Sequence, residues 1–282
     1  MSGLHVCLST LMADPMAATG DDVLAAVDVA ADAGFDGISV WTLHHLVAAR
    51  GGDDPLVDRI RAHGLTSPVV EAMAGWANAA DDAAVRDDAE FAIGVGQALG
   101  ATHSVAVCLD PDLVDPAATA RNLSLSASMA ADAGMSIAVE FLPWSGIPTL
   151  RSCVELIDRT GADNVGVLLD TWHWVRQPGG PDLATLRSLD GSMVSLLQVS
   201  DTGDVMDDLY VEATTARRLP GEGAVDFDEL FVALHTIGAE PIVSPEVFDL
   251  ASLAESPDEW PSRMATACRD LEARRTALGP EA

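Results

Sequence analysis

The segment "VGVLLDTWHWVRQ", residues 165–177, begins with a run of apolar residues that ends at a carboxylate, Asp170. A short apolar run of this kind is typical of a buried strand. Three positions beyond Asp170 comes His173, which stands between two tryptophans. The segment therefore predicts a buried strand whose carboxyl end carries residues able to bind a ligand or move a proton.

Strand-like runs alternate with longer helical patterns along the whole chain. Helical spacing is clear in residues 21–34, 83–100, 116–134 and 257–277, and Gly34 is expected to end the first of these helices. The predicted strands are residues 5–10, 36–41, 67–73, 103–109, 136–142, 165–171, 194–200 and 241–248. Eight strands alternating with helices predict an α/β fold, a parallel (β/α)8 TIM barrel, which typically needs about 250 residues.

We expect one barrel domain over residues 1–282, since no linker-like stretch divides the chain. An open doubly wound sheet is the alternative, but the turn after the first strand lacks the G-x-G-x-x-G pattern of that fold. One long irregular segment, residues 201–224, is expected between the seventh strand and its helix. Loops of that length in a compact domain are usually functional.

The charge balance excludes several classes of function. The 282 residues include 44 acidic and 15 basic ones, a formal net charge of -29, and every basic residue is arginine. No basic stripe exists to bind nucleic acid, and no lysine exists to form a Schiff base. No apolar stretch reaches the roughly 20 residues that span a bilayer, and no signal peptide is evident. We expect a cytoplasmic protein without a membrane partner, and assembly into a homo-oligomer is left open.

Four consecutive predicted strands place an oxygen-bearing side chain near their carboxyl ends. Because parallel barrels carry their chemistry at these ends, the four are expected to lie at one level. Three buried carboxylates without a cation would be very costly, so we predict one divalent metal ion. An all-oxygen set favours Mn²⁺ or Mg²⁺, with Co²⁺ as a third option. The predicted ligands are Glu140, Asp170, Gln198 and Glu246.

Other interpretations exist for single members of this set and its surroundings. An acid at a strand end is commonly the N-cap of the next helix, which is the alternative for Asp170. Asp201 is expected to cap a loop. His173 is expected above the metal as a substrate contact or proton carrier, or else as a core histidine. His45, Trp41 and Trp144 lie at or beyond strand ends and are expected to bind substrate together with Glu222, and His5 and His44 could also reach the pocket.

At these residues the sequence resembles the xylose isomerase-like TIM-barrel superfamily, the sugar phosphate isomerase/epimerase group. The resemblance covers nearly the whole chain and is strongest in "VEFLPW", "NVGVLLDTWHW", "LLQVSD", "RRLPGEG" and "SPEVF". It implies that Glu140 and Glu246 both bind the metal and move the proton, and that Asp170 is a ligand. It also implies that His173 and Arg217 contact substrate, and it leaves Arg218 as a surface residue.

The sequence departs from the epimerase pattern at Gln198, where epimerases have histidine. In this respect it is more similar to hydroxypyruvate isomerases and bacterial 3-dehydroshikimate dehydratases. The histidine-rich metal cluster of the endonuclease IV branch is missing. Glu222 in "PGEG" stands where a phosphate group would favour amides or cations, so an unphosphorylated, partly apolar or cyclic substrate is expected.

The resemblance implies an enzyme that removes a proton next to a carbonyl group. We expect a metal-dependent isomerase or epimerase of a small hydroxy-carbonyl substrate that works through an enolate. A dehydratase of the 3-dehydroshikimate or inosose type, which would use the same enolisation, is the first alternative. A ligand-binding barrel without catalytic activity is the second, and an interaction scaffold is the third.

Overall fold

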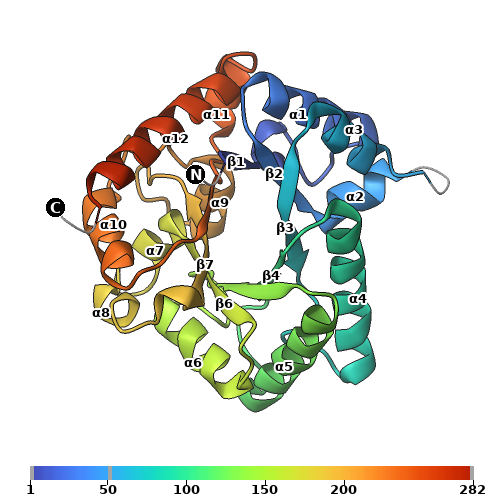
Figure 1. Cartoon of the computed structure of the whole chain (residues 1–282). Helices are drawn as coiled ribbons and strands as arrows, with labels where there is room; N and C mark the ends of the chain where they lie inside the picture. Colours follow the sequence, from blue (N-terminus) through green and yellow to red (C-terminus); the bar gives the residue numbers. More distant parts are fainter. Residues whose placement is uncertain (1–2, 50–52, 280–282) are drawn as a thin grey trace.

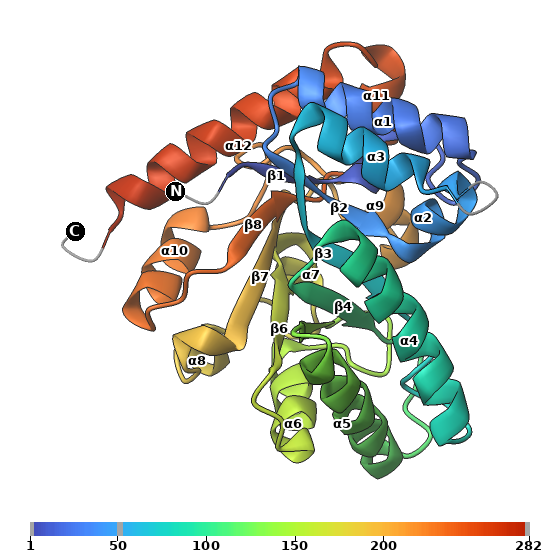
Figure 2. The same cartoon turned by 45° about the vertical axis from the view of Figure 1, so that its right-hand side comes forward.

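The computed structural model describes residues 3–49 and 53–279, and in these residues eight parallel strands form one sheet in chain order. Each strand pairs with the next, and β8 lies beside β1, so the sheet forms a nearly closed barrel (Figures 1 and 2). The predicted (β/α)8 barrel is confirmed. The strands are β1 His5–Cys7, β2 Gly37–Trp41, β3 Thr66–Met73, β4 His103–Val107, β5 Ser136–Glu140, β6 Val165–Asp170, β7 Val194–Val199 and β8 Ile242–Pro245.

Helices surround the barrel, and several short ones directly follow strands (Figure 1). The predicted helices are present with ends shifted by a few residues, and Gly34 follows α1 with a φ of 79°. The helices are α1 Gly20–Asp32, α2 Thr42–Ala48, α3 Pro55–His63, α4 Asp82–Leu99, α5 Pro116–Asp132, α6 Leu150–Thr160, α7 Thr171–Arg176, α8 Leu183–Leu186, α9 Leu209–Thr215, α10 Phe227–Thr236, α11 Leu250–Glu255 and α12 Trp260–Ala277.

Local signals in the sequence fix where the long helices begin and end. Thr19 forms a capping box with Asp22 at the start of α1, and Asp81 accepts a hydrogen bond from the Ala84 amide at the start of α4. Gly100 ends α4 with a φ of 78°, a left-handed conformation that glycine adopts without steric cost. These side chains satisfy backbone groups that a helix end leaves without partners.

Two predicted segments differ from expectation. The first strand ends at Cys7, because residues 8–11 form a 3-10 turn, η1, in which the Thr10 hydroxyl donates to the Cys7 carbonyl oxygen. The segment 201–224, expected to be irregular, contains α9, whose start is capped by Asp208. Both segments lie at the carboxyl ends of strands, where they contribute to the barrel mouth.

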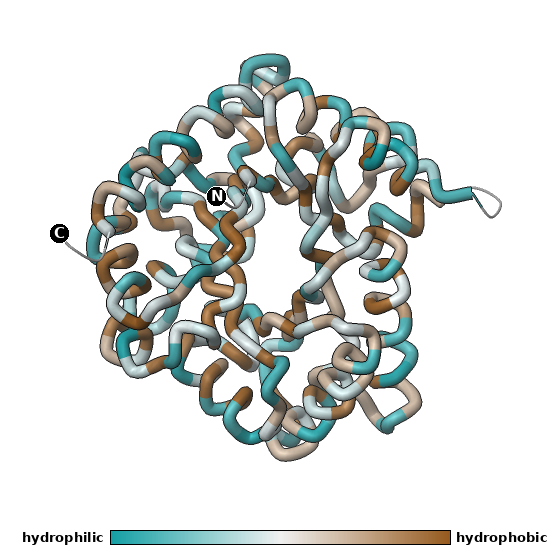
Figure 3. Tube along the Cα trace, in the orientation of Figure 1, coloured by the Kyte–Doolittle hydropathy of each residue, from teal (hydrophilic) through white to brown (hydrophobic). Residues whose placement is uncertain are grey.

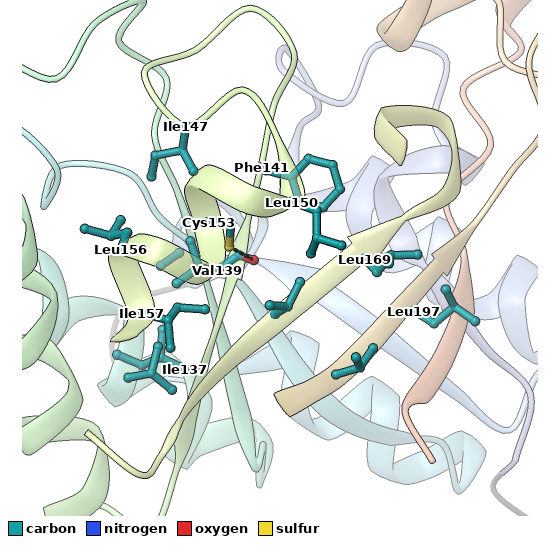
Figure 4. Packing of buried hydrophobic residues seen from close by; sticks show 14 of the residues in the cluster. Ile137, Val139, Phe141, Ile147, Leu150, Cys153, Leu156, Ile157, Leu169 and Leu197 are labelled. Atoms are coloured by element: carbon teal, nitrogen blue, oxygen red, sulfur yellow. Dashed lines mark hydrogen bonds between the residues drawn. The ribbon is translucent and has the colours of Figure 1, made fainter. Parts of the chain in front are cut away.

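The barrel is held by apolar layers on both sides of the sheet. Side chains that face outward from the sheet pack against the helices. Cys153 of α6 packs against β5, where its thiol donates to the Val139 carbonyl oxygen (3.5 Å, Figure 4). Side chains that face inward fill the lumen, and hydrophobic residues occur both along the strands and at intervals along the surrounding helices (Figure 3). The lumen layer consists of Val69, Val105, Val107, Ala138, Leu142, Leu168 and Leu196.

All four cysteines, Cys7, Cys108, Cys153 and Cys268, are buried and free. In the described parts of the chain, no helix is long and apolar enough to cross a bilayer.

We expect Gly166→Ala in β6 to destabilise the protein by about 1–3 kcal/mol through overpacking. A Cβ at this position would lie 2.7 Å from the Met193 carbonyl oxygen and closer still to the Ser195 hydroxyl. Gly94, exposed on α4, is the control: no described atom lies within 4 Å of a Cβ there, so Gly94→Ala should stabilise by about 0.5–1 kcal/mol. Urea unfolding followed by circular dichroism measures both, and a Gly166→Ala protein as stable as the parent would contradict this close packing.

Candidate metal centre and active site

A polar layer lies directly above the apolar layer of the lumen. Because side chains alternate along a strand, a residue two positions after a lumen-facing one also faces the lumen. Val69, Ala138, Leu168 and Leu196 belong to the apolar layer. Glu71, Glu140, Asp170 and Gln198 each follow one of them by two residues, and all four are buried. The strand period therefore collects these polar groups at the carboxyl end of the barrel.

Glu140, Asp170 and His173 form the first group of side chains in this layer. One ligand atom from each lies within 4.8 Å of the others. His173 Nε2 is 3.2 Å from Glu140 Oε1, and Asp170 Oδ1 accepts a hydrogen bond from the His173 backbone amide (2.9 Å). Asp170 is thus the N-cap of α7, as the alternative interpretation held, and its other oxygen, Oδ2, accepts a hydrogen bond from Arg217 Nη1 (2.8 Å).

Cys7, Glu71 and Glu246 form the second group, again with one ligand atom each within 4.8 Å. Gln198 joins this group, since its Nε2 donates to Glu246 Oε1 at 3.3 Å and to Glu71 Oε2 at 3.4 Å. Cys7 Sγ lies 3.5 Å and 3.8 Å from the same two oxygens. Of the predicted ligands, Glu246 therefore lies with Gln198, while Glu140 lies with Asp170.

Arg217 connects the two groups. Its Nη1 is 2.8 Å from Asp170 Oδ2 and 3.1 Å from Glu246 Oε2, and its Nε donates to the Ala213 carbonyl oxygen. The guanidinium also lies over the rings of Trp172 and Phe248. Arg217, predicted to contact substrate, is buried and compensates part of the negative charge of the carboxylates.

The mouth of the barrel holds more negative charge than this arginine can balance. Burial, together with neighbouring carboxylates, raises the pKa of Glu140 well above its usual range. Burial likewise raises the pKa of Glu246 well above its usual range and raises that of Glu71, although Arg217 opposes the shift of Glu246. Burial also favours the neutral acid of Asp170, but the charge of Arg217 and the hydrogen bonds from Arg217 and the His173 backbone amide together outweigh it, so the pKa of Asp170 is lowered.

His173 is neutral at physiological pH, because burial lowers its pKa to about 3. A neutral imidazole has one N–H donor and one acceptor nitrogen. The Nε2 atom faces Glu140, and Nδ1 has no hydrogen-bond partner among the described residues. His173 can therefore offer a hydrogen bond to a bound ligand without adding charge to the site.

The residues of the polar layer fit a divalent cation. Gln198 Oε1 is buried and has no hydrogen-bond partner in the described chain, so an oxygen donor is free at the level of the carboxylates. Carboxylate and amide oxygens are the donors that Mg²⁺ and Mn²⁺ prefer. A divalent ion would also favour the charged forms of carboxyl groups whose pKa values burial has raised.

The structure brings some of the predicted pocket residues to this layer and separates others from it. Trp144 makes edge contacts with His173, Trp172 and Tyr210, at ring-centroid distances of 5.3, 6.2 and 5.6 Å. Trp41 ends β2 directly opposite Glu71 of β3 in the sheet register. Both indoles therefore border the polar layer.

His45 and Glu222 make their contacts elsewhere. His45 Nε2 lies 2.7 Å from Asp54 Oδ2 at the start of α3, and Glu222 is exposed in the turn after Pro220. His44 and His5 contact the Pro15 carbonyl oxygen and the Thr66 hydroxyl, respectively. These three histidines near strand ends thus form hydrogen bonds with other segments, whereas His173 lies beside Glu140 in the polar layer.

Two further expectations concern the loop after β7. Asp201 accepts hydrogen bonds from the backbone amides of Thr202, Gly221 and Val225, so it caps the loop as predicted. Arg218 is exposed, as expected of a surface residue. The capped loop holds the segment that contains Arg217 against the barrel mouth.

Sequence reasoning missed Glu71 and Cys7, because it considered strand ends only in the second half of the chain. Glu71 stands in "SPVVEAM", a single acid in an apolar run, which is the same signal that identified Glu140 in "SIAVEFL". Cys7 ends β1 and resembles a small core residue in the sequence. Only its neighbours in the closed barrel distinguish it from the other cysteines.

Comparisons with a family model and with individual proteins show what this chain is similar to. The family model described as xylose isomerase-like TIM barrel matches residues 27–269. An inosose isomerase of Bacillus subtilis is 32% identical over 117 residues, which are 41% of this chain and 41% of that enzyme. A 3-dehydroshikimate dehydratase of Pseudomonas aeruginosa is 29% identical over 157 residues, which are 54% of this chain and 24% of that enzyme.

The matched segments thus span less than half the length of either relative.

Among solved structures, the IolI protein with a bound zinc atom has a TM-score of 0.80 and 21% identity, covering 97% of this chain and 99% of that one. This likeness shows the same fold over almost the entire length of both chains. The match to the family model over most of the sequence places this protein in the xylose isomerase-like TIM-barrel family.

Proposed function

We propose that this protein is a divalent-metal-dependent isomerase or epimerase that acts on a small hydroxy-carbonyl compound, most simply a cyclic keto-polyol. The observation that carries the proposal is the buried polar layer with two carboxyl groups, Glu140 and Glu246, whose pKa values are raised well above normal. The partial similarity to an inosose isomerase supports this substrate class. A small molecule is the proposed partner, because the polar layer is buried at the base of the barrel mouth.

The proposed ligands are Glu140, Asp170, Gln198 and Glu246, with Gln198 contributing its amide oxygen. A bound divalent ion would stabilise negative charge that develops on a substrate oxygen, an effect worth several kcal/mol. Mn²⁺ or Mg²⁺ suits these oxygen donors, and Co²⁺ is a third candidate. The zinc atom of the IolI protein supports the presence of a divalent ion in this fold, although that protein need not share the same preference.

Glu140 and Glu246 are the proposed proton carriers. A carboxylate removes a proton from carbon efficiently when its pKa approaches the working pH, and both residues have pKa values shifted in that direction by burial. Glu140 ends β5 and Glu246 directly follows β8, three strands away in the barrel order, so they would approach a bound substrate from different sides. This arrangement suits removal of a proton by one carboxylate and its return by the other.

The aromatic side chains around the polar layer define the proposed substrate. Trp144 contacts His173 and Tyr210 above the carboxylates, which gives the entrance an apolar wall. Arg217 is engaged by Asp170 and Glu246, so it offers little to a phosphate group. An unphosphorylated ring with one apolar face and several hydroxyl groups fits this environment best.

A dehydratase is the second candidate, favoured by the similarity to 3-dehydroshikimate dehydratase over 54% of the chain. Elimination would begin with the same proton removal and continue with loss of a β-hydroxyl group. In this candidate reaction the neutral imidazole of His173, which lies beside Glu140, would relay to the departing hydroxyl group the proton that the carboxylate has removed. A barrel that binds a ligand without turnover is the third candidate.

We expect removal of the metal to abolish activity. Protein purified without chelator should contain about one equivalent of a divalent ion, and extensive dialysis against a chelator should remove activity that Mn²⁺, Mg²⁺ or Co²⁺ restores. Metal analysis by mass spectrometry and turnover assays on inososes, ketoses and 3-dehydroshikimate measure both quantities. Full activity of the chelated protein would contradict metal dependence, and bound metal without turnover on any substrate would favour the ligand-binding barrel.

We expect Glu246→Gln to lower solvent deuterium exchange at the substrate carbon by at least about a hundredfold, because an amide cannot accept the proton. Metal binding should weaken but persist, since the amide oxygen can still coordinate. Nuclear magnetic resonance of the substrate in D₂O measures the exchange. Glu255→Gln, at an exposed position on α11, is the control and should exchange at the parent rate. Exchange at the parent rate in Glu246→Gln would rule out Glu246 as the proton carrier.

His173→Asn distinguishes the two reactions. In a dehydratase, His173 acts after enolisation, so exchange should continue while loss of hydroxide stops. In an isomerase or epimerase it only orients the substrate, so exchange and turnover should fall in the same proportion. The proposed isomerase predicts parallel loss, measured by deuterium exchange and product formation on the same samples.

We expect Gln198→His to shift metal preference towards Zn²⁺, because an imidazole nitrogen is a softer donor than an amide oxygen. Competition titrations with Mn²⁺, Co²⁺ and Zn²⁺ on parent and variant protein measure the change. An identical order and spacing of affinities in the two proteins would show that residue 198 does not touch the metal.

A further inference from the structure

Gln198 raises a question that a histidine or carboxylate ligand does not. The end of an amide side chain carries one oxygen and one nitrogen of nearly equal size, and only the oxygen can bind a metal ion. A metal site that uses glutamine therefore needs neighbours that select the orientation of the amide.

We propose that Glu71, reaching across the lumen from β3, is a positioning residue that fixes the Gln198 amide so that its oxygen remains available to the metal. This inference rests on the proposed function, because it assumes that Gln198 is a ligand. It adds a role for a residue that the proposed reaction itself does not use.

The geometry that supports the proposal is a set of contacts across the barrel. β3 and β7 are four strands apart in an eight-stranded barrel and therefore face one another across the lumen. Gln198 Nε2 donates to Glu71 Oε2 at 3.4 Å and to Glu246 Oε1 at 3.3 Å. The Cys7 thiol lies against the same two oxygens, at 3.8 Å and 3.5 Å. Two donors, the amide and the thiol, thus share two carboxylate acceptors.

These acceptors decide which way the amide lies. Rotating the amide by half a turn would bring its oxygen against the two carboxylate oxygens, and the three acceptors would then share only the weak donor of the Cys7 thiol. The orientation with Nε2 towards the carboxylates avoids this repulsion. It leaves Gln198 Oε1 buried and without a hydrogen-bond partner among the described residues. This oxygen is therefore available to bind a cation.

Of the two carboxylates, Glu71 is the one dedicated to this role. Glu246 is engaged by Arg217 through Oε2 and is itself a proposed ligand. Glu71 makes no ion pair in the described chain, and its remaining oxygen, Oε1, has no partner there. It is 5% exposed, so water competes little with Gln198 for Oε2. Residues that orient metal ligands from behind commonly change metal affinity by about 10- to 100-fold when they are replaced.

The test measures binding of Co²⁺ and Mn²⁺ to metal-free protein by titration calorimetry, together with the visible absorption of the Co²⁺-loaded protein. A glutamine at position 71 can donate as well as accept, so it no longer selects one orientation of Gln198. We expect Glu71→Gln to weaken Co²⁺ binding by at least about tenfold. We also expect its visible spectrum at saturation to change, because the amide oxygen no longer occupies its coordination position in every molecule.

The second variant exchanges the two groups. Glu71→Gln combined with Gln198→Glu keeps the net charge of the site and keeps one amide donor facing one carboxylate. Because the two oxygens of a carboxylate at position 198 are equivalent, this protein no longer depends on the orientation of an amide and should recover most of the lost Co²⁺ affinity. Glu155→Gln, an exposed glutamate on α6, is the charge control and should bind Co²⁺ as the parent does. Thermal unfolding of each metal-free variant shows that it is folded.

Two results would overturn the inference alone. The first is Glu71→Gln with parental Co²⁺ affinity. The second is Glu71→Gln with weaker binding but an unchanged spectrum at saturation, since Glu71 would then supply only charge. If Glu71→Gln does not fold, the double variant provides the test. A Co²⁺ affinity more than about tenfold below that of the parent in this protein would contradict the proposed positioning role of Glu71. A parent protein that binds neither Co²⁺ nor Mn²⁺ would instead overturn the proposed metal site and this inference with it.

Discussion

Mutual repulsion among buried carboxylates is the constraint on which the barrel mouth depends. Glu71, Glu140, Asp170 and Glu246 lie in one buried layer, and like charges in a medium of low polarity repel strongly. Two features reduce this repulsion. Arg217 forms ion pairs with Asp170 and Glu246, and the pKa values of the three glutamates are raised. One guanidinium does not balance four carboxylates, and this excess of negative charge is the physical basis for proposing a divalent ion.

Contacts below and above the polar layer hold its charged groups in position. Below them the lumen is filled with apolar side chains, which exclude water and fix the strand ends. Above them the segment after β7 is fastened by Asp201, whose carboxylate accepts three backbone amides, and by buried Glu212, which pairs with Arg176. The loop that carries Arg217 is thereby part of the scaffold, and the arginine is held where the carboxylates need it.

If Gln198 binds the metal as proposed, its neutral side chain makes demands on its surroundings that a charged ligand would not make. A neutral amide brings no charge to a site that already holds four carboxyl groups, but it can present either of two ends. In the proposed arrangement, its hydrogen bonds to Glu71 and Glu246 restrict it to one of these ends. In a site of this kind, some residues would bind the metal, and residues on the far side of the barrel would orient those ligands.

The sequence by itself determined the barrel and much of the polar layer, because both follow from local patterns. Strand and helix alternation predicted the fold, and single polar residues in apolar runs identified Glu140, Asp170 and Gln198 at strand ends, since a strand repeats every two residues whatever surrounds it. The predicted roles of these residues remain proposals. The boundaries of β1 and the helix within residues 201–224 were not predicted, because hydrogen bonds to Cys7 and Asp208 decide them locally.

Only the tertiary structure decided which side chains meet. Cys7, Glu71 and Gln198 are separated by 64 and 127 positions along the chain, and only closure of the barrel brings β1, β3 and β7 around one lumen. The same closure placed Arg217 between Asp170 and Glu246, while His45 paired with nearby Asp54 and Glu222 stayed in solvent. Periodicity along a strand is a property of neighbouring residues, whereas contact across a barrel depends on the order and register of all eight strands.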